Sequence, residues 1–121
     1  ADEVVKLKPK LEKEMNLTKD QLNNLAAAKR NAKKALGLKS VKELPKIVVV
    51  KRIEEAGYEH AIGTYDHEEK TIYLRADILK DKAKATRTLI HEAIHWQTGA
   101  GDNTPEFTSG FEKAILRLLG F

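Results

Sequence analysis

The sequence predicts an α+β fold: a backing helix, a small three-stranded sheet, a helix that carries the candidate site, and a closing C-terminal helix. Three observations predict it. Apolar residues recur at helical spacing within residues 18–36, β-branched or alternating segments occupy residues 47–74, and helical spacing returns after residue 81. No internal repeat or interdomain linker is visible, so residues 1–121 are expected to form a single domain.

The backing helix is predicted to begin after Thr18. Thr18 and Gln21 form a capping box, in which each side chain bonds the backbone of the other residue, and Gly37 ends the helix. Upstream, residues 4–9 are expected to be extended and residues 11–15 to form a short helical turn. The apolar stripe of the helix is expected to consist of Leu22, Leu25, Ala26, Ala32 and Leu36.

Three strands are expected to follow. Residues 47–53 are apolar and β-branched, which is typical of a buried strand. Residues 60–65 form the second predicted strand, with Gly63 inside it. A polar hairpin loop at residues 66–70 leads to the third strand, residues 71–74.

Two helices are predicted in the last third of the chain. After a helical turn at residues 77–79, Asp81 caps a helix that ends at Gly99. Asn103 or Thr104 then caps the closing helix, which has a proline at its first position. The expected core residues are Leu89, Ile90, Ala93 and Ile94 in the first helix and Phe107, Phe111, Ala114, Ile115, Leu118 and Leu119 in the second.

His91, Glu92 and His95 spell H-E-x-x-H within the first of these helices. Residues i and i+4 of a helix lie one above the other, so both imidazoles can converge on one tetrahedral zinc ion. Glu92 would then lie beside the metal and accept a proton from zinc-bound water as the general base. The alternative is that these are polar residues on a helix flank. The zinc site is favoured because both histidines border the apolar stripe of a well-capped helix.

Catalytic zinc usually has three protein ligands and one open position. Asp102 is the first candidate for the third ligand, because Gly99 and Gly101 would let the chain double back under the helix. Its alternative role is to cap the closing helix. Glu112 and Glu106 are the next candidates, followed by water or one of the two remaining histidines.

Composition restricts the cofactor, the partners and the compartment. The chain has no cysteine, so zinc would have to use imidazole and carboxylate ligands. With no visible signal peptide and no apolar run long enough for a bilayer, a cytoplasmic location without membrane contact is expected. Residues 1–52 contain 14 Lys and Arg against 6 Asp and Glu, a net charge of +8. No aromatic residue interleaves this basic run, so nucleic-acid binding is not expected.

With this motif and this order of elements, the chain resembles the zincin metallopeptidases. Its layout over residues 18–119 is similar to minimal gluzincin-like peptidase domains, although only His91, Glu92 and His95 match residue by residue. The resemblance implies a zincin-like fold, a Zn²⁺ cofactor and a peptide or protein substrate. It also implies that substrate binds in extended form along the edge strand before the active-site helix, which by order is residues 71–74.

A second, local resemblance concerns the turn after the active-site helix. Residues 95–102 resemble short-spacer zincin-like domains, and residues 105–107 match the Pro-Glu-Phe of SprT-like proteases. In that family a ligating histidine precedes this tripeptide, whereas here Asn103 occupies about that place.

The sequence therefore predicts a zinc-dependent metallopeptidase with Glu92 as general base and His91, His95 and Asp102 as metal ligands. Two alternatives stay open. One is a latent or non-catalytic zinc-binding domain whose site is covered by the apolar residues 118–121. The other is a basic interaction module in which zinc only holds the helices together and has no catalytic role. The candidates for stabilising the oxyanion are Tyr65, Tyr73 and His60.

Overall fold

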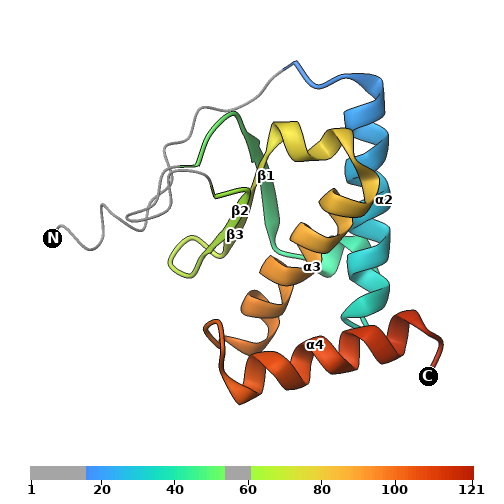
Figure 1. Ribbon diagram of the computed structural model, residues 1–121, viewed down its shortest axis with the longest axis vertical. Helices are drawn as coiled ribbons and strands as arrows, with labels where there is room; N and C mark the ends of the chain where they lie inside the picture. Colours follow the sequence, from blue (N-terminus) through green and yellow to red (C-terminus); the bar gives the residue numbers. More distant parts are fainter. Residues whose placement is uncertain (1–15, 54–60) are drawn as a thin grey trace, which may run out of the picture.

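The computed structural model describes residues 16–53 and 61–121 (Figure 1). The predicted extended segment and turn before Thr18 lie outside these ranges, as does His60. The described part confirms the α+β class, with helices on one side of a small mixed sheet. Its elements are α2 (Lys19–Ala35), η1 (Val41–Glu43), β1 (Lys46–Val50), β2 (Gly63–Asp66), β3 (Thr71–Arg75), η2 (Ala76–Lys80), α3 (Lys82–Thr98) and α4 (Pro105–Leu118).

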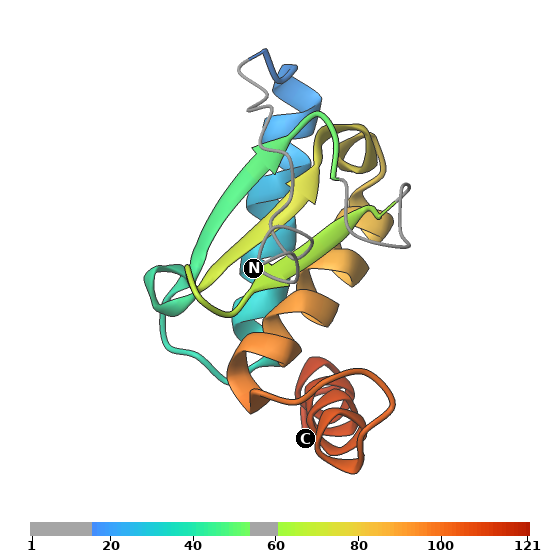
Figure 2. The same ribbon diagram turned by 90° about the vertical axis from the view of Figure 1, so that its left-hand side faces the viewer.

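The strands lie in the order β1-β3-β2, side by side in front of α2 and α3 in Figure 2. β3 pairs in parallel with β1 and antiparallel with β2. The expectation that residues 71–74 form the edge strand is therefore wrong, because the hairpin places β2 on one side of β3 while β1 pairs on the other. The edge strand beside α3 is β2, whose Gly63 lies directly against Thr88.

Two predicted strands have different bounds. β1 ends at Val50, although Ile53 is still buried at 1% exposed. The described part of the second strand begins at Gly63. The residues of β3 from Thr71 to Leu74 are all buried, which is consistent with its central position.

The capping box of α2 is confirmed: the backbone N–H of Gln21 donates to Thr18 Oγ1 and that of Thr18 donates to Gln21 Oε1. The predicted stripe is partly wrong, because Leu22 and Ala26 are exposed. Gln21 also donates through Nε2 to the carbonyl of Ala76, which turns its side of α2 inward. Ala32 and Leu36 of the predicted stripe are buried, and Leu25 packs partly buried against the same core. The other buried residues of this segment are Gln21, Ala28 and Ala35.

The helix with the H-E-x-x-H motif forms as predicted. Asp81 accepts a hydrogen bond from the backbone N–H of Lys84, and Gly99 ends α3 in the left-handed conformation at φ 68°. The expected core stripe is confirmed, and these residues pack against the sheet and α2: Leu89, Ile90, Ala93 and Ile94.

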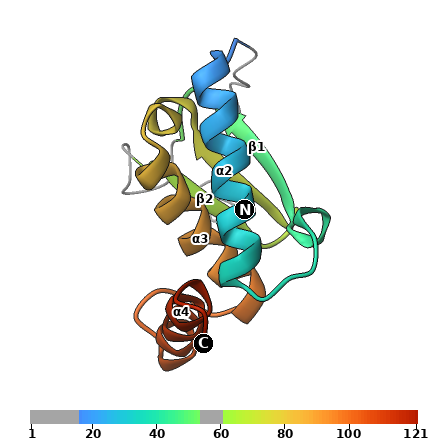
Figure 3. The same ribbon diagram turned by 90° about the vertical axis from the view of Figure 1, so that its right-hand side faces the viewer.

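The core face predicted for the closing helix is largely wrong. Thr104 caps α4 as one of the two alternatives predicted, but Ala114 is the only buried residue of this helix. α4 lies across the ends of α2 and α3 and does not run along the sheet (Figures 1 and 3). Of the residues predicted as core, Phe107 is partly buried, whereas Phe111, Ile115, Leu118 and Leu119 are 41%, 43%, 37% and 68% exposed.

None of the helices in the described ranges has the length and apolar character needed to cross a bilayer.

Candidate metal centre

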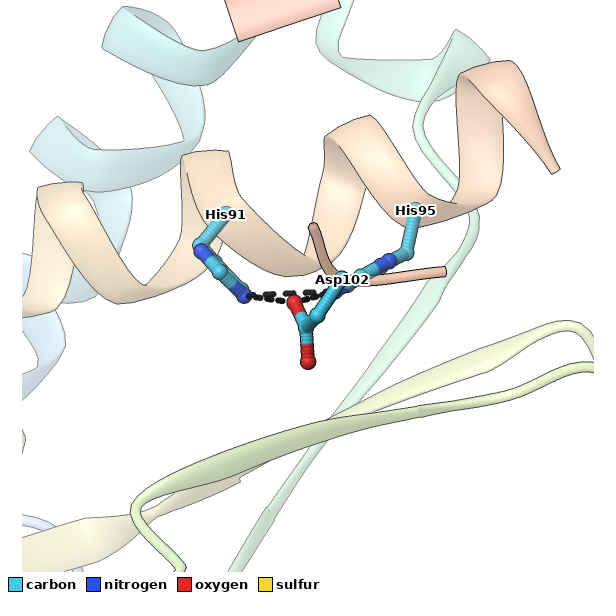
Figure 4. Close-up of side chains that lie close together, drawn as sticks. All are labelled: His91, His95 and Asp102. Atoms are coloured by element: carbon cyan, nitrogen blue, oxygen red, sulfur yellow. Dashed lines mark hydrogen bonds and ion pairs between the residues drawn. The ribbon is translucent and has the colours of Figure 1, made fainter. Parts of the chain in front are cut away.

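Three side chains with metal-ligand atoms converge at the C-terminal end of α3 (Figure 4). His91 and His95 extend from the helix, and Asp102 reaches them from the loop that leads to α4. The two histidine Nε2 atoms lie 3.2 Å apart, and Asp102 Oδ1 lies 3.2 Å from His91 Nε2 and 3.0 Å from His95 Nε2. Among the described residues, this His-His-Asp group could hold a metal ion.

The loop after α3 brings Asp102 to this position. The left-handed conformation of Gly99 reverses the chain at the helix end, and Asn103 adopts a second positive φ of 62° just after Asp102. Gly101, the second glycine expected to let the chain double back, is not among the residues with a positive φ. Short polar contacts fix the loop: Ala100 N–H donates to Thr98 Oγ1 at 3.1 Å, and Thr104 Oγ1 donates to the carbonyl of Gly101 at 2.9 Å.

The backbone carbonyl of Ala100 fixes the tautomer of His95. It lies 2.8 Å from His95 Nδ1 and only accepts hydrogen bonds, so Nδ1 must carry the proton. In the neutral ring, Nε2 then presents a lone pair toward Asp102 Oδ1, which also only accepts. Two acceptors 3.0 Å apart repel each other unless a proton or a metal ion lies between them. A carbonyl bonded to the outer nitrogen of a histidine is the usual support for a metal ligand.

Charge and burial favour the ligating form of His91. Burial lowers its pKa and the neighbouring His95 lowers it further, while the carboxylate of Asp102 opposes both effects. The net effect is a pKa below the ordinary value, which keeps the imidazole neutral and able to bind a metal. The solvent exposure of the three side chains decreases from 65% for Asp102 to 41% for His91 and 12% for His95.

Phe107 forms an apolar wall behind the two imidazoles, with ring centroids 4.9 Å from His91 and 4.6 Å from His95. Beside this wall lies a cavity of about 510 Å³, which His91 and Asp102 line together with Phe107 and Phe111. The metal group thus borders a cavity whose walls are partly aromatic. The apolar residues 118–121 do not bury the group, since Asp102 is exposed and Phe121 is itself 87% exposed.

Glu92 lies on the side of α3 that faces the sheet and is 9% exposed. A Cβ placed on Gly63 of β2 would lie 3.5 Å from Glu92 Cγ, so the side chain packs between the helix and the edge strand. Glu92 is not part of the His-His-Asp group. The general-base role of Glu92, which needs a carboxylate beside the metal and not bound to it, therefore stays a prediction.

The structure also shows where the other candidate ligands and oxyanion donors lie. Glu106 and Glu112 are exposed on α4 and do not join the His-His-Asp group. Tyr73 packs with Val50 and Ile53 in the core on the other face of the sheet, so its proposed role at the site is wrong. Tyr65 pairs with Ile72 in the sheet and lies on the face that packs against the helices, so it stays a candidate for stabilising the oxyanion. Burial raises the pKa of its phenol, and the charge of Asp66 raises it further.

Two features of the centre could not be found from the sequence. The Ala100 carbonyl is a backbone group and leaves no side-chain signal, and Phe107 reads simply as core. Comparison with protein-family models, curated proteins and solved structures found no match for the chain. The zincin resemblance therefore stays a prediction from the H-E-x-x-H motif and the order of elements.

Proposed function

We propose that this chain is a zinc-dependent metallopeptidase in which His91, His95 and Asp102 hold the ion. The observation that supports this best is the spacing of the three ligand atoms, which lie 3.0–3.2 Å apart. Two ligands at 2.0–2.1 Å from a tetrahedral ion are about 3.3 Å apart, so the triangle fits zinc after a small expansion. Two imidazoles and one carboxylate, with no thiolate, are a donor set that catalytic zinc accepts.

Bound zinc supplies a Lewis acid for the scissile carbonyl and lowers the pKa of a bound water. The chain supplies the rest. The Ala100 carbonyl holds the ring of His95 in one orientation, and the exposed side of Asp102 leaves the cavity open to a substrate. The carboxylate of Glu92 accepts the proton of the attacking water and returns it to the leaving amine. Tyr65, on the same side of the sheet as α3, is the remaining candidate to donate a hydrogen bond to the oxyanion.

The edge strand that would bind an extended peptide is β2. One edge of β2 pairs with β3, and within the described ranges no strand pairs with the other edge. A peptide added there would run beside α3, because Gly63 brings β2 against Thr88 and Glu92. This replaces the earlier assignment of residues 71–74, whose two edges are both occupied.

The test is the substitution Glu92→Gln, which keeps size and polarity and removes the proton acceptor. Cleavage of a fluorescent casein should fall by at least about a hundredfold, while zinc content stays near that of the wild-type protein. Glu112→Gln is the matched control, because Glu112 is exposed on α4 and outside the metal group. Wild-type activity in Glu92→Gln, or activity that survives complete removal of metal by a chelator, would contradict the proposal.

A further inference from the structure

A groove of about 640 Å³ lies where α2, α3 and α4 converge. We refer to it as the three-helix groove. α4 contributes Phe111, Ile115 and Leu118, which follow i, i+4, i+7 spacing on one helix face, and α3 contributes Ile90. The three α4 side chains are 41%, 43% and 37% exposed. An apolar helix stripe left open to water is typical of a surface that another molecule covers.

The rim of the three-helix groove is basic. Arg30 of α2 and Lys82 and Arg87 of α3 line it, and all three residues are exposed. None of the described residues that line the groove is an Asp or a Glu. The groove therefore combines an apolar floor with a rim of a single charge sign, which specifies both the shape and the charge of its occupant.

We infer that the three-helix groove binds an amphipathic, acidic helix of a partner protein. Such a helix would place apolar side chains at i, i+4 and i+7 against Ile115 and Leu118. Its flanking Asp and Glu side chains would meet Arg30 and Arg87, which fixes the orientation and speeds association. This interaction is independent of the proposed peptidase activity.

Two other occupants fit less well. In a symmetric dimer each groove would face the groove of a second copy. The basic side chains of both rims would then lie near one another, and no carboxylate lines the groove to neutralise them. An anionic bilayer would satisfy the charges, but the apolar side chains form the floor of a depression between helices. A flat surface does not fill such a depression, whereas a helix does.

The position of the groove gives the interaction a consequence for the metal centre. Phe111 lines both the three-helix groove and the cavity beside His91. A docked helix would therefore hold the protein that carries it next to the metal group. It would also contact the aromatic side chain that separates the two spaces.

The test is fluorescence anisotropy with a labelled synthetic peptide of about 16 residues, roughly four helical turns. The peptide carries leucines at i, i+4 and i+7 with flanking glutamates, and it should bind the full chain saturably. Ile115→Asp should weaken binding by at least about tenfold. Leu116→Asp is the matched control, because Leu116 lies on the same helix, is 49% exposed, and does not line the groove. Its affinity should stay within about twofold of the wild-type value.

A second pair of variants tests the charges without touching the apolar floor. Arg30→Glu should weaken binding of the acidic peptide. Lys34→Glu is the control and should not weaken it, because Lys34 is exposed one turn further along α2 and does not line the groove. A scrambled peptide of the same composition, and one with lysine in place of glutamate, should fail to bind. Equal binding of the scrambled peptide would overturn the inference. The inference would also be overturned if the acidic peptide does not bind and the chain instead forms a dimer that Ile115→Asp abolishes. The same holds if the acidic peptide does not bind and the chain instead binds phosphatidylserine vesicles in a way that Ile115→Asp abolishes.

Discussion

Replacing Gly63 with alanine should lower the free energy of unfolding by about 1–3 kcal/mol, because the added methyl group has no room. A Cβ there would lie 2.7 Å from Thr88 Cγ2 and 3.5 Å from both Glu92 Cγ and Leu74 Cδ2. Ordinary carbon contacts begin near about 3.5 Å, so β2 and α3 must separate by about 0.8 Å or Thr88 must rotate. Rotation is opposed by the hydrogen bond that Thr88 Oγ1 donates to the carbonyl of Lys84 at 2.7 Å.

Urea unfolding followed by the fluorescence of Trp96, the single tryptophan, measures this loss. Gly101→Ala is the control, because nothing lies within 4 Å of a Cβ at that position, and it should change stability by less than about 1 kcal/mol. Thr88→Ser removes the clashing methyl group and keeps the hydroxyl, so it should recover much of the loss in the double variant. If Gly63→Ala unfolds like the wild type, or if the two substitutions simply add, the close packing of β2 on α3 is refuted.

Two further predictions concern side chains that are partly or largely exposed. Asp102→Ala should weaken zinc affinity by at least about tenfold in a chelator competition, whereas Glu106→Ala and Glu112→Ala should leave it unchanged; loss of metal in Glu112→Ala alone would refute the ligand assignment. The hydrogen bond from Arg75 Nε, at 2.6 Å, lowers the pKa of Asp77 below the ordinary aspartate value of 3.8. The stabilisation from this pair is therefore present above pH 3.8 and is lost as the pH falls through the lowered pKa. Asp77→Asn should therefore cost about 0.2–1 kcal/mol at neutral pH, and the difference should vanish in acid; a difference that persists below the lowered pKa would show a different origin.

The features that the sequence predicted correctly depend on short-range interactions. The caps at Thr18, Asp81 and Gly99 each involve bonds within four residues, so the pattern of residue types is enough to place them. The i, i+4 spacing of His91 and His95 likewise holds in any α-helix. The approach of Asp102 could be predicted because only a short turn separates it from the helix.

The errors come from interactions between distant parts of the chain. Whether residues 71–74 lie at the edge or in the centre of the sheet depends on β1, which pairs with them across more than twenty residues of sequence. The exposure of Ile115 depends on the angle at which α4 crosses α2 and α3, and the same apolar stripe would suit a helix packed along the sheet. Gly110 permits the close crossing, since a Cβ there would lie 2.9 Å from Thr98 Cγ2.

A crystal of the protein purified without added metal, measured at the zinc absorption edge, tests the central claim most directly. We expect one anomalous peak bounded by His91 Nε2, His95 Nε2 and Asp102 Oδ1, at about 2.0–2.2 Å from each atom. Its fourth position should be open to water within reach of the Glu92 carboxylate. No peak in crystals soaked with zinc, or a peak held by Glu106 or Glu112 in place of Asp102, would contradict the account.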